Sequence, residues 1–487
     1  MDSHRRFELS DLYPREPNLF KVDEEEDLSF APLVNSGRDI SVVELSKSGY
    51  DPKLWLHSPA RGVVRQDKGP FLSRSLRGWR KFILSAFLPV DFPNSVSDDY
   101  LAYQTYDSLQ AFFSTITSLL ASRALLQGLG VGDANSSATY AMLLTILRDA
   151  ISNIATIVFA HRFGLRIEPE AKKYRFLADV FNDTAFFLEL CSPYLSFWGK
   201  AVAMCTGEAL RAVCGVAAGA SKAALSLHFA KNDNLSELSA KEASQETAVS
   251  LIGLLVGTIV VRLVQDPRAV VCLVIALVLG HLWTNYRGVR CVHMNSLNKQ
   301  RASILFEVYM ESRDILRPNE VAEEERILFW NGIITNSHQE PVFRIDFAKS
   351  YAHAVSSDGV EQEIVAVDGP MHTRFVRPYS PTRPGQIKIL LWDGAEPKHA
   401  ILAWFMAMDT AWMTEKDVPY GDAKPVSPRK ASGDNGRGRI IDEFKPSARD
   451  ERLWTMMKSK GWDLGAGVME TGPGVRLGVR MTKRKNE

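Results

Sequence analysis

The stretch from Ser236 to Gly257 constrains the fold most, because a dense polar head runs directly into an apolar helix. Ser239 followed by Glu242 is typical of a capping box, in which the hydroxyl and the carboxylate each accept a hydrogen bond from a backbone N–H at the helix start. After Ala248 the helix carries no charge before Arg262. A segment of this kind needs an apolar surrounding for its tail and polar partners for its head.

The chain has 487 residues, which is too long for one ordinary core and predicts two or three domains. Lys and Arg total 58 against 57 Asp and Glu, so the bulk charge gives no indication of nucleic-acid binding. The middle, about Tyr106 to Tyr286, is rich in Ala, Leu and Val, whereas the flanks carry most charges and prolines. The mean hydropathy of −0.10 fits either a membrane core with a soluble domain or a large buried helical bundle.

We predict about six helices in the middle of the chain, arranged as hairpins. They are Asp98–Leu126, Ala138–His161, Tyr174–Leu190, Phe197–Ala230, Ser239–Val264 and Ala269–Tyr286. The last two have apolar spans at the lower edge of the ~17–25 residues that cross a bilayer. The pair Gly215-x-x-x-Gly219 is typical of close helix packing, most of all in lipid. The predicted fold class is therefore mainly α, a membrane-type bundle followed by a small α+β domain.

The third helix carries a polar stripe, since Arg175, Asp179 and Glu189 share one face at helical spacing. In a soluble helix such a stripe faces water, but here the neighbouring helices are apolar nearly all round, which favours an inward stripe. Ionisable groups within membrane segments usually face a bundle interior. The candidate ligand-binding residues are Asp107, Gln110, Arg148, Asp149, Arg175, Asp179, Asn182, Asp183, Lys222, Lys241, Glu242, Gln245 and Glu246. The alternative is an ion-pair network that only fixes helix register.

The flanks predict separate units. Residues 1–70 read as a partly ordered arm with one short strand at Ile40–Leu45, and residues 71–300 as the helical core. Ser73–Leu88 is a basic helix with aromatic residues that either lies in a membrane interface or packs on the bundle. Residues 301–487 read as an α+β domain with a disordered loop at 421–438 and a final strand pair near 465–471 and 474–481.

No catalytic or metal-binding pattern stands out. The run Gly128–Gly132 follows a helix and lacks the Lys-Ser/Thr of a phosphate loop, so a helix end and turn is the better interpretation. The five cysteines form no CxxC pair, and the ten histidines show no ligand spacing. We therefore expect no enzyme activity, no metal and no cofactor, although Lys222 or Lys241 could form a Schiff base with an aldehyde.

The helical core resembles the Root UVB Sensitive (RUS) family over roughly residues 70–300. The matching stretches are Phe87–Tyr100, Tyr106–Phe112, Gly128–Gly132, Phe176–Asp183, Ala217–Leu225 and Ser239–Thr247. The resemblance implies a membrane-associated protein, and plant members are implicated in vitamin B6 homeostasis and early seedling development. Some of those members are plastid proteins, but the residues after Met1 show no transit signal, and we do not expect that location here.

The resemblance and the polar residues together suggest a non-enzymatic integral membrane protein that binds or moves a small polar metabolite, with a vitamin B6 vitamer as the candidate ligand. The alternative is a membrane-anchored scaffold that recruits protein partners through its C-terminal domain. The expected partner is a lipid membrane rather than nucleic acid. A homo-oligomer and a hetero-oligomer with another family member both stay open, as does the identity of the membrane.

Overall fold

The computed structural model describes residues 40–44, 53–58, 62–65, 79, 82–128, 138–352, 363–366, 371–376, 385–412 and 448–478. The chain forms two compact units, Met1–Gly78 and Trp79–Glu487. In the first unit, β1 (Ile40–Glu44), β2 (Lys53–Ser58) and β3 (Gly62–Arg65) form an antiparallel sheet in that order. The sequence indicated only the first of these strands. The loop predicted at 421–438 lies outside the described residues.

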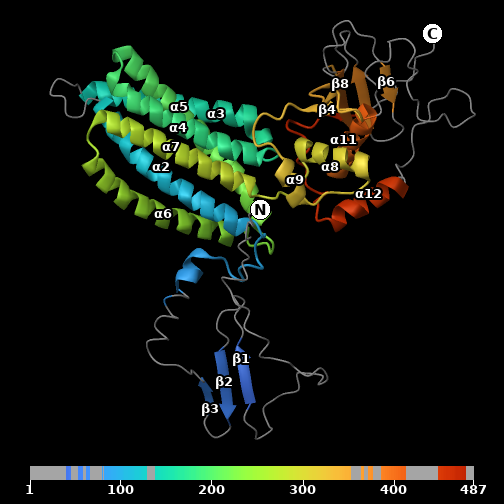
Figure 1. Cartoon of the computed structure of the whole chain (residues 1–487), viewed down its shortest axis with the longest axis horizontal. Helices are drawn as coiled ribbons and strands as arrows, with labels where there is room; N and C mark the ends of the chain where they lie inside the picture. Colours follow the sequence, from blue (N-terminus) through green and yellow to red (C-terminus); the bar gives the residue numbers. More distant parts are fainter. Residues whose placement is uncertain are drawn as a thin grey trace, which may run out of the picture. The chain divides into compact units, whose positions relative to one another are not determined.

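Helices that run side by side form the larger part of the second unit, as Figure 1 shows. Within its described residues they are α2 (Tyr100–Gly128), α3 (Ala138–Ile167), α4 (Ala171–Cys191), α5 (Phe197–Phe229), α6 (Leu235–Leu263) and α7 (Pro267–Arg290). The predicted fold class, a mainly helical bundle followed by a small domain of sheet and helix, is confirmed. Helix α2 packs between α6 and α7, α4 packs on α5, α2 and α7, and α3 packs on α5.

Glycines let α6 and α7 approach α2 closely, but they are not the glycines that the sequence suggested. A Cβ added to Gly253 would lie 3.0 Å from Thr115 Cβ, and one on Gly257 would lie 3.5 Å from Ile116 Cα. On α7, a Cβ on Gly288 would lie 3.2 Å from Tyr106 Cβ. Gly215 has open space where its Cβ would be, as does Gly219, so the close packing predicted for that pair is wrong.

The capping box predicted at Ser239 is also wrong, because α6 begins a turn earlier, at Leu235 after Asn234. Ser239 is therefore inside the helix, and the buried Glu242 carboxylate accepts a hydrogen bond from Ser226 of α5 at 2.9 Å instead. The start of α7, by contrast, has the usual N-terminal cap of a helix. The Asp266 carboxylate accepts from the Ala269 N–H at 2.9 Å, and proline occupies the first helical position.

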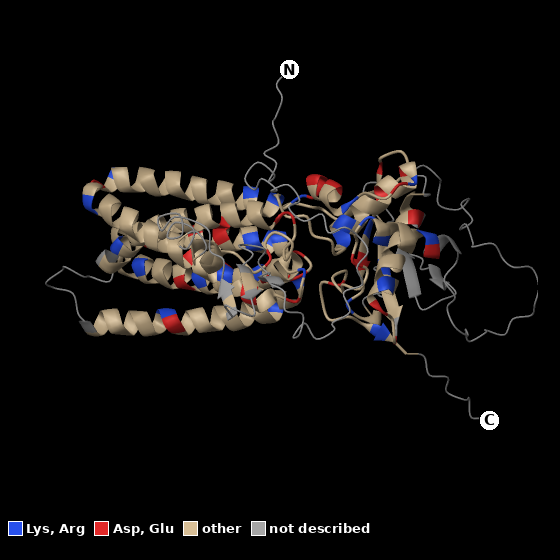
Figure 2. Cartoon of the chain, turned by 90° about the horizontal axis from the view of Figure 1, so that it is seen from below, with Lys and Arg blue, Asp and Glu red and all other residues tan. Residues whose placement is uncertain are grey.

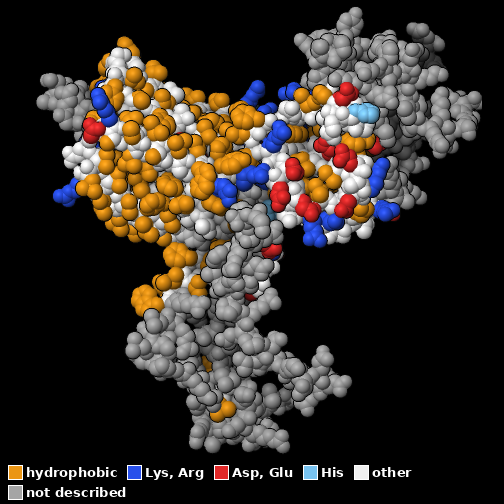
Figure 3. Space-filling model, viewed as in Figure 1, with side chains coloured by type: hydrophobic (Ala, Val, Ile, Leu, Met, Phe, Trp, Pro, Cys, Tyr) orange, Lys and Arg blue, Asp and Glu red, His pale blue; other side chains and the backbone are white. Residues whose placement is uncertain are grey.

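The face of the bundle that Figure 3 shows is largely apolar, as its orange surface indicates. Large side chains point outward along its length, among them Ile157 at 68% exposed, Val202 at 64% and Leu255 at 63%. Among the described residues, five helices (α2, α3, α5, α6 and α7) are long and apolar enough to cross a membrane. Helix α4 does not belong to this set, because it is more polar and more enclosed.

The C-terminal part of the second unit is a small α+β region. Its described elements are α8 (Lys299–Ser312), α9 (Pro318–Glu324), β4 (Ile333–Thr335), β5 (Pro341–Phe347), β6 (Glu363–Ala366), β7 (Met371–Val376), β8 (Gly385–Trp392), α11 (Pro397–Trp412), α12 (Ala448–Ser459) and β9 (Arg476–Leu477). The strands pair in the order β4-β5-β8-β7-β6, with β9 beside β8. The expected strand at residues 465–471 is wrong, because that segment consists of bends and turns around the buried Trp462 and Met469.

A buried ion-pair triad ties the bundle to this region. Lys172, at the start of α4, lies 2.5 Å from the Glu325 carboxylate, and Arg301 of α8 lies 3.1 Å from its other oxygen. All three side chains are at most 5% exposed. Burial alone would raise the pKa of Glu325, but the charges of Lys172 and Arg301 lower it below the usual value. The carboxylate therefore stays ionised and paired at neutral pH.

Candidate functional site

Helix α4 brings the densest charge into the interior of the bundle. Lys172, Arg175, Asp179, Asp183 and Glu189 are all buried, although each is an ionisable residue. Their spacing places them on the faces of α4 that meet α2, α5 and α7. Charges are rarely buried without partners, so the contacts of these side chains define the site.

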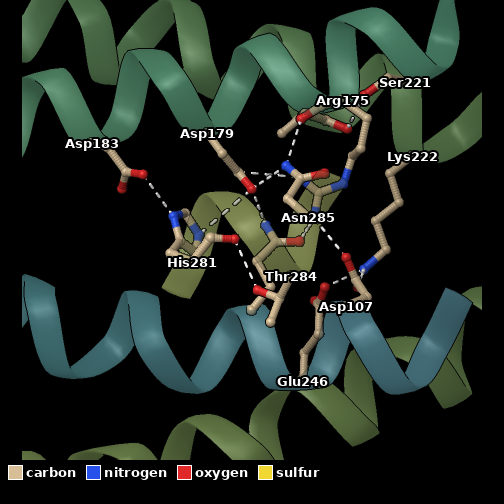
Figure 4. Close-up of polar contacts among 12 residues, drawn as sticks. Asp107, Arg175, Asp179, Asp183, Ser221, Lys222, Glu246, His281, Thr284 and Asn285 are labelled. Atoms are coloured by element: carbon tan, nitrogen blue, oxygen red, sulfur yellow. Dashed lines mark hydrogen bonds and ion pairs between the residues drawn. The ribbon is translucent and has the colours of Figure 1, made fainter. Parts of the chain in front are cut away.

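Arg175 is the centre of the network (Figure 4). Its guanidinium lies 2.6 Å from an Asp107 oxygen and 3.2 Å from an Asp179 oxygen. It also donates to the side-chain amide oxygen of Gln110 at 3.1 Å and to the Tyr103 hydroxyl at 3.3 Å. One arginine of α4 thus pairs with two buried carboxylates and fixes the position of α2 relative to α4.

Asp179 and Asp183 share a histidine that the sequence did not mark as a site residue. His281 Nδ1 lies 2.9 Å from an Asp183 oxygen, and its Nε2 lies 3.5 Å from Asp179. The second Asp179 oxygen also accepts from the Gln110 and Asn285 amides. This part of the network therefore joins α2, α4 and α7.

Lys222 and Glu246 extend the network toward the surface of the bundle. They form an ion pair between α5 and α6, and Lys222 Nζ lies 3.9 Å from Asp107 Oδ2. Both side chains are partly exposed, at 26% and 37%. Charges of alternating sign thus lead from the half-exposed Glu246, through Lys222, Asp107 and Arg175, to the buried Asp179 and His281.

A polar cleft opens beside this path. It has a volume of about 470 Å³ and lies between α2, α4, α5 and α6. We call it the bundle cleft, and its lining residues are Ala111, Ser114, Thr115, Ser118, Leu119, Asn182, Phe186, Arg211, Glu246, Ser250 and Leu254. Hydroxyl, amide, cationic and anionic groups thus surround one space with a few apolar side chains. The half-buried Asn182 amide has no hydrogen-bond partner among the described residues.

The remaining predicted residues lie elsewhere. Arg148 of α3 pairs with Glu208 of α5 at 2.5 Å, and the adjacent Asp149 is exposed, so its predicted inward position is wrong. Successive helical residues point about 100° apart, and Arg148 takes the direction toward α5. Lys241 and Gln245 donate to the carbonyls of Ser85 and Phe87 and so hold a short helix at residues 82–87 against α6.

Three residues of the network were missed from the sequence: Tyr103, His281 and Asn285. His281 was the only potentially charged residue in the last apolar helix, and it was interpreted as a core or interface histidine. Asn285 lies four residues further on, at helical spacing from it. Two polar residues at this spacing on one face of an apolar helix were the signal that could have identified His281 and Asn285 as site residues.

A second polar cluster lies where α2 begins. Asp99 pairs with His228 at 3.0 Å and accepts from the His293 N–H at 2.6 Å and the Ser97 hydroxyl at 2.5 Å. Burial would raise the pKa of Asp99, but His228 and these donors lower it far below its usual range. Its carboxylate thus holds together the start of α2, the end of α5 and the segment that follows α7, and we interpret this as a structural role. In the described ranges no group of three His, Cys, Asp or Glu side chains is placed to hold a metal ion.

Comparison with known proteins identifies the helical core. Residues 73–313 match the family model of the vitamin B6 photo-protection and homoeostasis domain. RUS family member 1 of Dictyostelium discoideum is 39% identical over 256 residues, which cover 52% of this chain and 49% of that protein. The chain belongs to the RUS family. Protein root UVB sensitive 3 of Arabidopsis thaliana is 35% identical over 268 residues, 55% of this chain and 60% of the relative.

The chain thus spans about half to three fifths of these RUS relatives. Protein root UVB sensitive 2, chloroplastic, of Arabidopsis thaliana is 28% identical over 254 residues, 50% of this chain and 56% of the relative. No solved structure matches the chain. The RUS family is linked to vitamin B6 homeostasis, and its matched region includes the bundle and α8, which carry both the buried network and the bundle cleft.

Proposed function

We propose that this RUS protein is an integral membrane protein whose bundle binds a small polar metabolite and moves it along the charged path. Vitamin B6 vitamers are the first candidate ligands, because of the family to which the chain belongs. The observation that carries the proposal is the continuous line of charged side chains from Glu246 at the bundle cleft to Asp183 and His281 in the interior.

The distribution of side chains supports a membrane location. Large apolar side chains are exposed along the five long helices, and Arg175, Asp179 and Asp183 of α4 face inward. A soluble bundle has the opposite pattern, since exposed apolar patches above a few hundred Å² are rare on monomeric soluble proteins. In lipid, ionisable side chains face the bundle interior and mark ligand or proton pathways.

The interior also has unused hydrogen-bonding capacity. Asp107 Oδ2, Asp183 Oδ1 and Glu242 Oε1 are buried oxygens without a hydrogen-bond partner. Leaving such an acceptor unpaired costs about 1–3 kcal/mol, and more for a charged group. A network made only to fix helix register has no need of these open acceptors, whereas a ligand or water with N–H and O–H groups could use them.

The bundle cleft suits a vitamer in size and chemistry. Its volume of about 470 Å³ lies in the ~300–1,000 Å³ range of small-molecule sites. A vitamer presents a flat ring with a ring nitrogen and several hydroxyl groups. Asn182, Ser114 and Ser250 can hydrogen-bond such groups, while the lining residues Phe186 and Leu254 offer apolar contacts for the ring.

Binding of pyridoxine, pyridoxal and pyridoxamine to the purified full chain in detergent tests the proposal. We expect Asn182→Leu, which keeps the branched shape of the side chain, to weaken binding about fivefold, because one hydrogen bond is worth about 1 kcal/mol. The matched control is Asp149→Asn, which alters an exposed polar group of α3 and should leave the affinity unchanged. The proposal fails if no vitamer binds, or if Asn182→Leu binds as well as the unchanged chain.

Two alternatives stay predictions with separate tests. An enzyme that holds an aldehyde vitamer on Lys222 or Lys241 should show the absorbance of an internal aldimine when purified with it. A scaffold should lose its partners, and its biological role, when the C-terminal region is removed. Because Lys172, Glu325 and Arg301 join that region to the bundle, the stability of the truncated chain must be measured beside its phenotype.

A further inference from the structure

A second and larger cleft lies where the bundle meets the C-terminal region. It has a volume of about 1150 Å³ and is formed by the end of α3, the start of α4, the start of α8, the segment 325–332, β5, β8 and residues 470–473. We call it the junction cleft. It shares no lining residue with the bundle cleft, so the inference below does not depend on the vitamer proposal.

The junction cleft is strongly basic. Its described lining contains ten Lys or Arg residues and four Asp or Glu residues, although the whole chain is balanced at 58 and 57. Figure 2 marks several Lys and Arg positions in blue at this end of the bundle, and Figure 3 shows basic side chains there, where the apolar surface of the bundle stops. Excess charge on a concave surface focuses the electrostatic potential and attracts anions.

The carboxylates in the lining do not neutralise this excess. Glu325 pairs with Lys172 and Arg301, and the other three pairs are Glu170 with Lys173, Asp346 with Lys299, and Glu470 with Arg476. Four arginines of the lining form no ion pair with any carboxylate in the described ranges. They are Arg162, Arg166, Arg326 and Arg344.

Two further donors in the cleft wall lack partners. Arg301 is 2% exposed, and its Nε has no hydrogen-bond partner. The first turn of α4 also lines the cleft, and its N-cap residue, Glu170, makes no side-chain hydrogen bond to the free N–H groups there. Free N–H groups at a helix start favour an anion, and phosphate is a common one.

The wall of the junction cleft also has an apolar side. Phe329 is 90% exposed, and its backbone has a φ of 60°, which is uncommon for a bulky residue. Leu165 of α3 is 60% exposed. An apolar or aromatic group beside the anion would cover these side chains.

We propose that the junction cleft binds a phosphate monoester that carries an apolar or aromatic group. Guanidinium groups match phosphate oxygens in pairs, and several unpaired arginines suit a dianion better than a single negative charge. The ester could be a soluble aryl or alkyl phosphate or the headgroup of a lipid such as phosphatidic acid. Both sources present the same dianion and the same apolar neighbour.

The test compares binding of two probes to the full chain in detergent. Phenyl phosphate represents the soluble source, and short-chain phosphatidic acid represents the lipid source. The pairs Arg326→Ala with Arg344→Ala, and Arg162→Ala with Arg166→Ala, remove charge from the two sides of the cleft. The control pair, Arg452→Ala with Lys458→Ala, removes the same charge from exposed positions on α12.

We expect at least one probe to bind, and each cleft pair to weaken its binding tenfold or more while the control pair changes it less than twofold. The probe that binds more tightly identifies the source. Thermal unfolding midpoints of all variants show whether they remain folded. The inference is overturned if neither probe binds, if the control pair has the same effect, or if short-chain phosphatidylglycerol, a phosphate diester, binds as tightly as phosphatidic acid.

Discussion

Replacing Arg175 with methionine is the most direct perturbation of the charged interior. The substitution keeps a long side chain but removes the cation that lies 2.6 Å from Asp107 and 3.2 Å from Asp179. Both carboxylates are buried, at 3% and 5% exposed, so neither can recover the lost interaction from water. Breaking a buried ion pair by removing one partner costs about 3–5 kcal/mol.

We therefore expect Arg175→Met to lower the free energy of unfolding of the bundle by about 3–5 kcal/mol. The assay is reversible unfolding of the full chain in mixed micelles, followed by the circular dichroism of the helices. Adding Asp107→Asn and Asp179→Asn to Arg175→Met should restore most of the lost stability, since replacing a whole buried charged set with neutral groups is often close to neutral.

The matched control is Arg162→Met, because Arg162 is an exposed arginine of α3 without an ion pair among the described residues. Surface substitutions usually change stability by less than about 0.5 kcal/mol. A loss below about 1 kcal/mol for Arg175→Met, or a triple variant no more stable than the single one, would refute the reasoning, because the carboxylates would then not depend on Arg175.

Two further predictions concern helix packing and pH. Gly253→Leu should destabilise the bundle or displace α6 from α2, because a Cβ on Gly253 would lie 3.0 Å from Thr115 of α2. Gly215→Leu should be tolerated, because Gly215 has open space at that position. Unfolding of the two variants side by side measures the difference, and equal losses of stability would contradict the packing. Since Lys172 and Arg301 lower the pKa of Glu325 below its usual 4.5, the ionised carboxylate stabilises the fold above that value, and this contribution is lost as the pH falls through the lower folded-state pKa. Glu325→Gln should flatten the stability curve below pH 4.5, and an unchanged acid limb would show that Glu325 does not contribute.

Much of the helical core could be predicted from the sequence, because long apolar runs are a strong local signal. The inward position of Arg175, Asp179 and Asp183 also followed from spacing along one helix. Neither observation needed knowledge of distant residues. The ligand-binding role given to these side chains stays a prediction.

The wrong predictions concern residues whose environment depends on a neighbouring helix. Gly215 and Gly253 both begin a G-x-x-x-G pattern, but only Gly253 has a helix packed against it. The local sequence around Glu242 fits a capping box, but the Glu242 carboxylate accepts a hydrogen bond from Ser226 of α5 instead. Asp149 was assigned inward with Arg148, although only one of two successive residues can face α5.

The two clefts could not be derived from local patterns at all. Asn182 and Ser250 of the bundle cleft, or Arg162 and Arg344 of the junction cleft, are far apart in the chain and meet only through the packing of helices and strands. Each arginine alone reads as an ordinary surface charge. Their common location is what gives them a possible shared role.

The central claim is that lipid covers the bundle and that the charged network around Arg175 faces inward. Labelling with a water-soluble maleimide in intact membranes tests it, using Leu255→Cys on α6 and Lys458→Cys on α12 in a chain without the exposed Cys191 and Cys272. Both positions are exposed on the protein surface. We expect Lys458→Cys to react in membranes made permeable to the reagent, and Leu255→Cys to react only after denaturation. Equal labelling of the two cysteines in the permeable membranes before denaturation, with release of the protein by alkaline carbonate, would contradict the account.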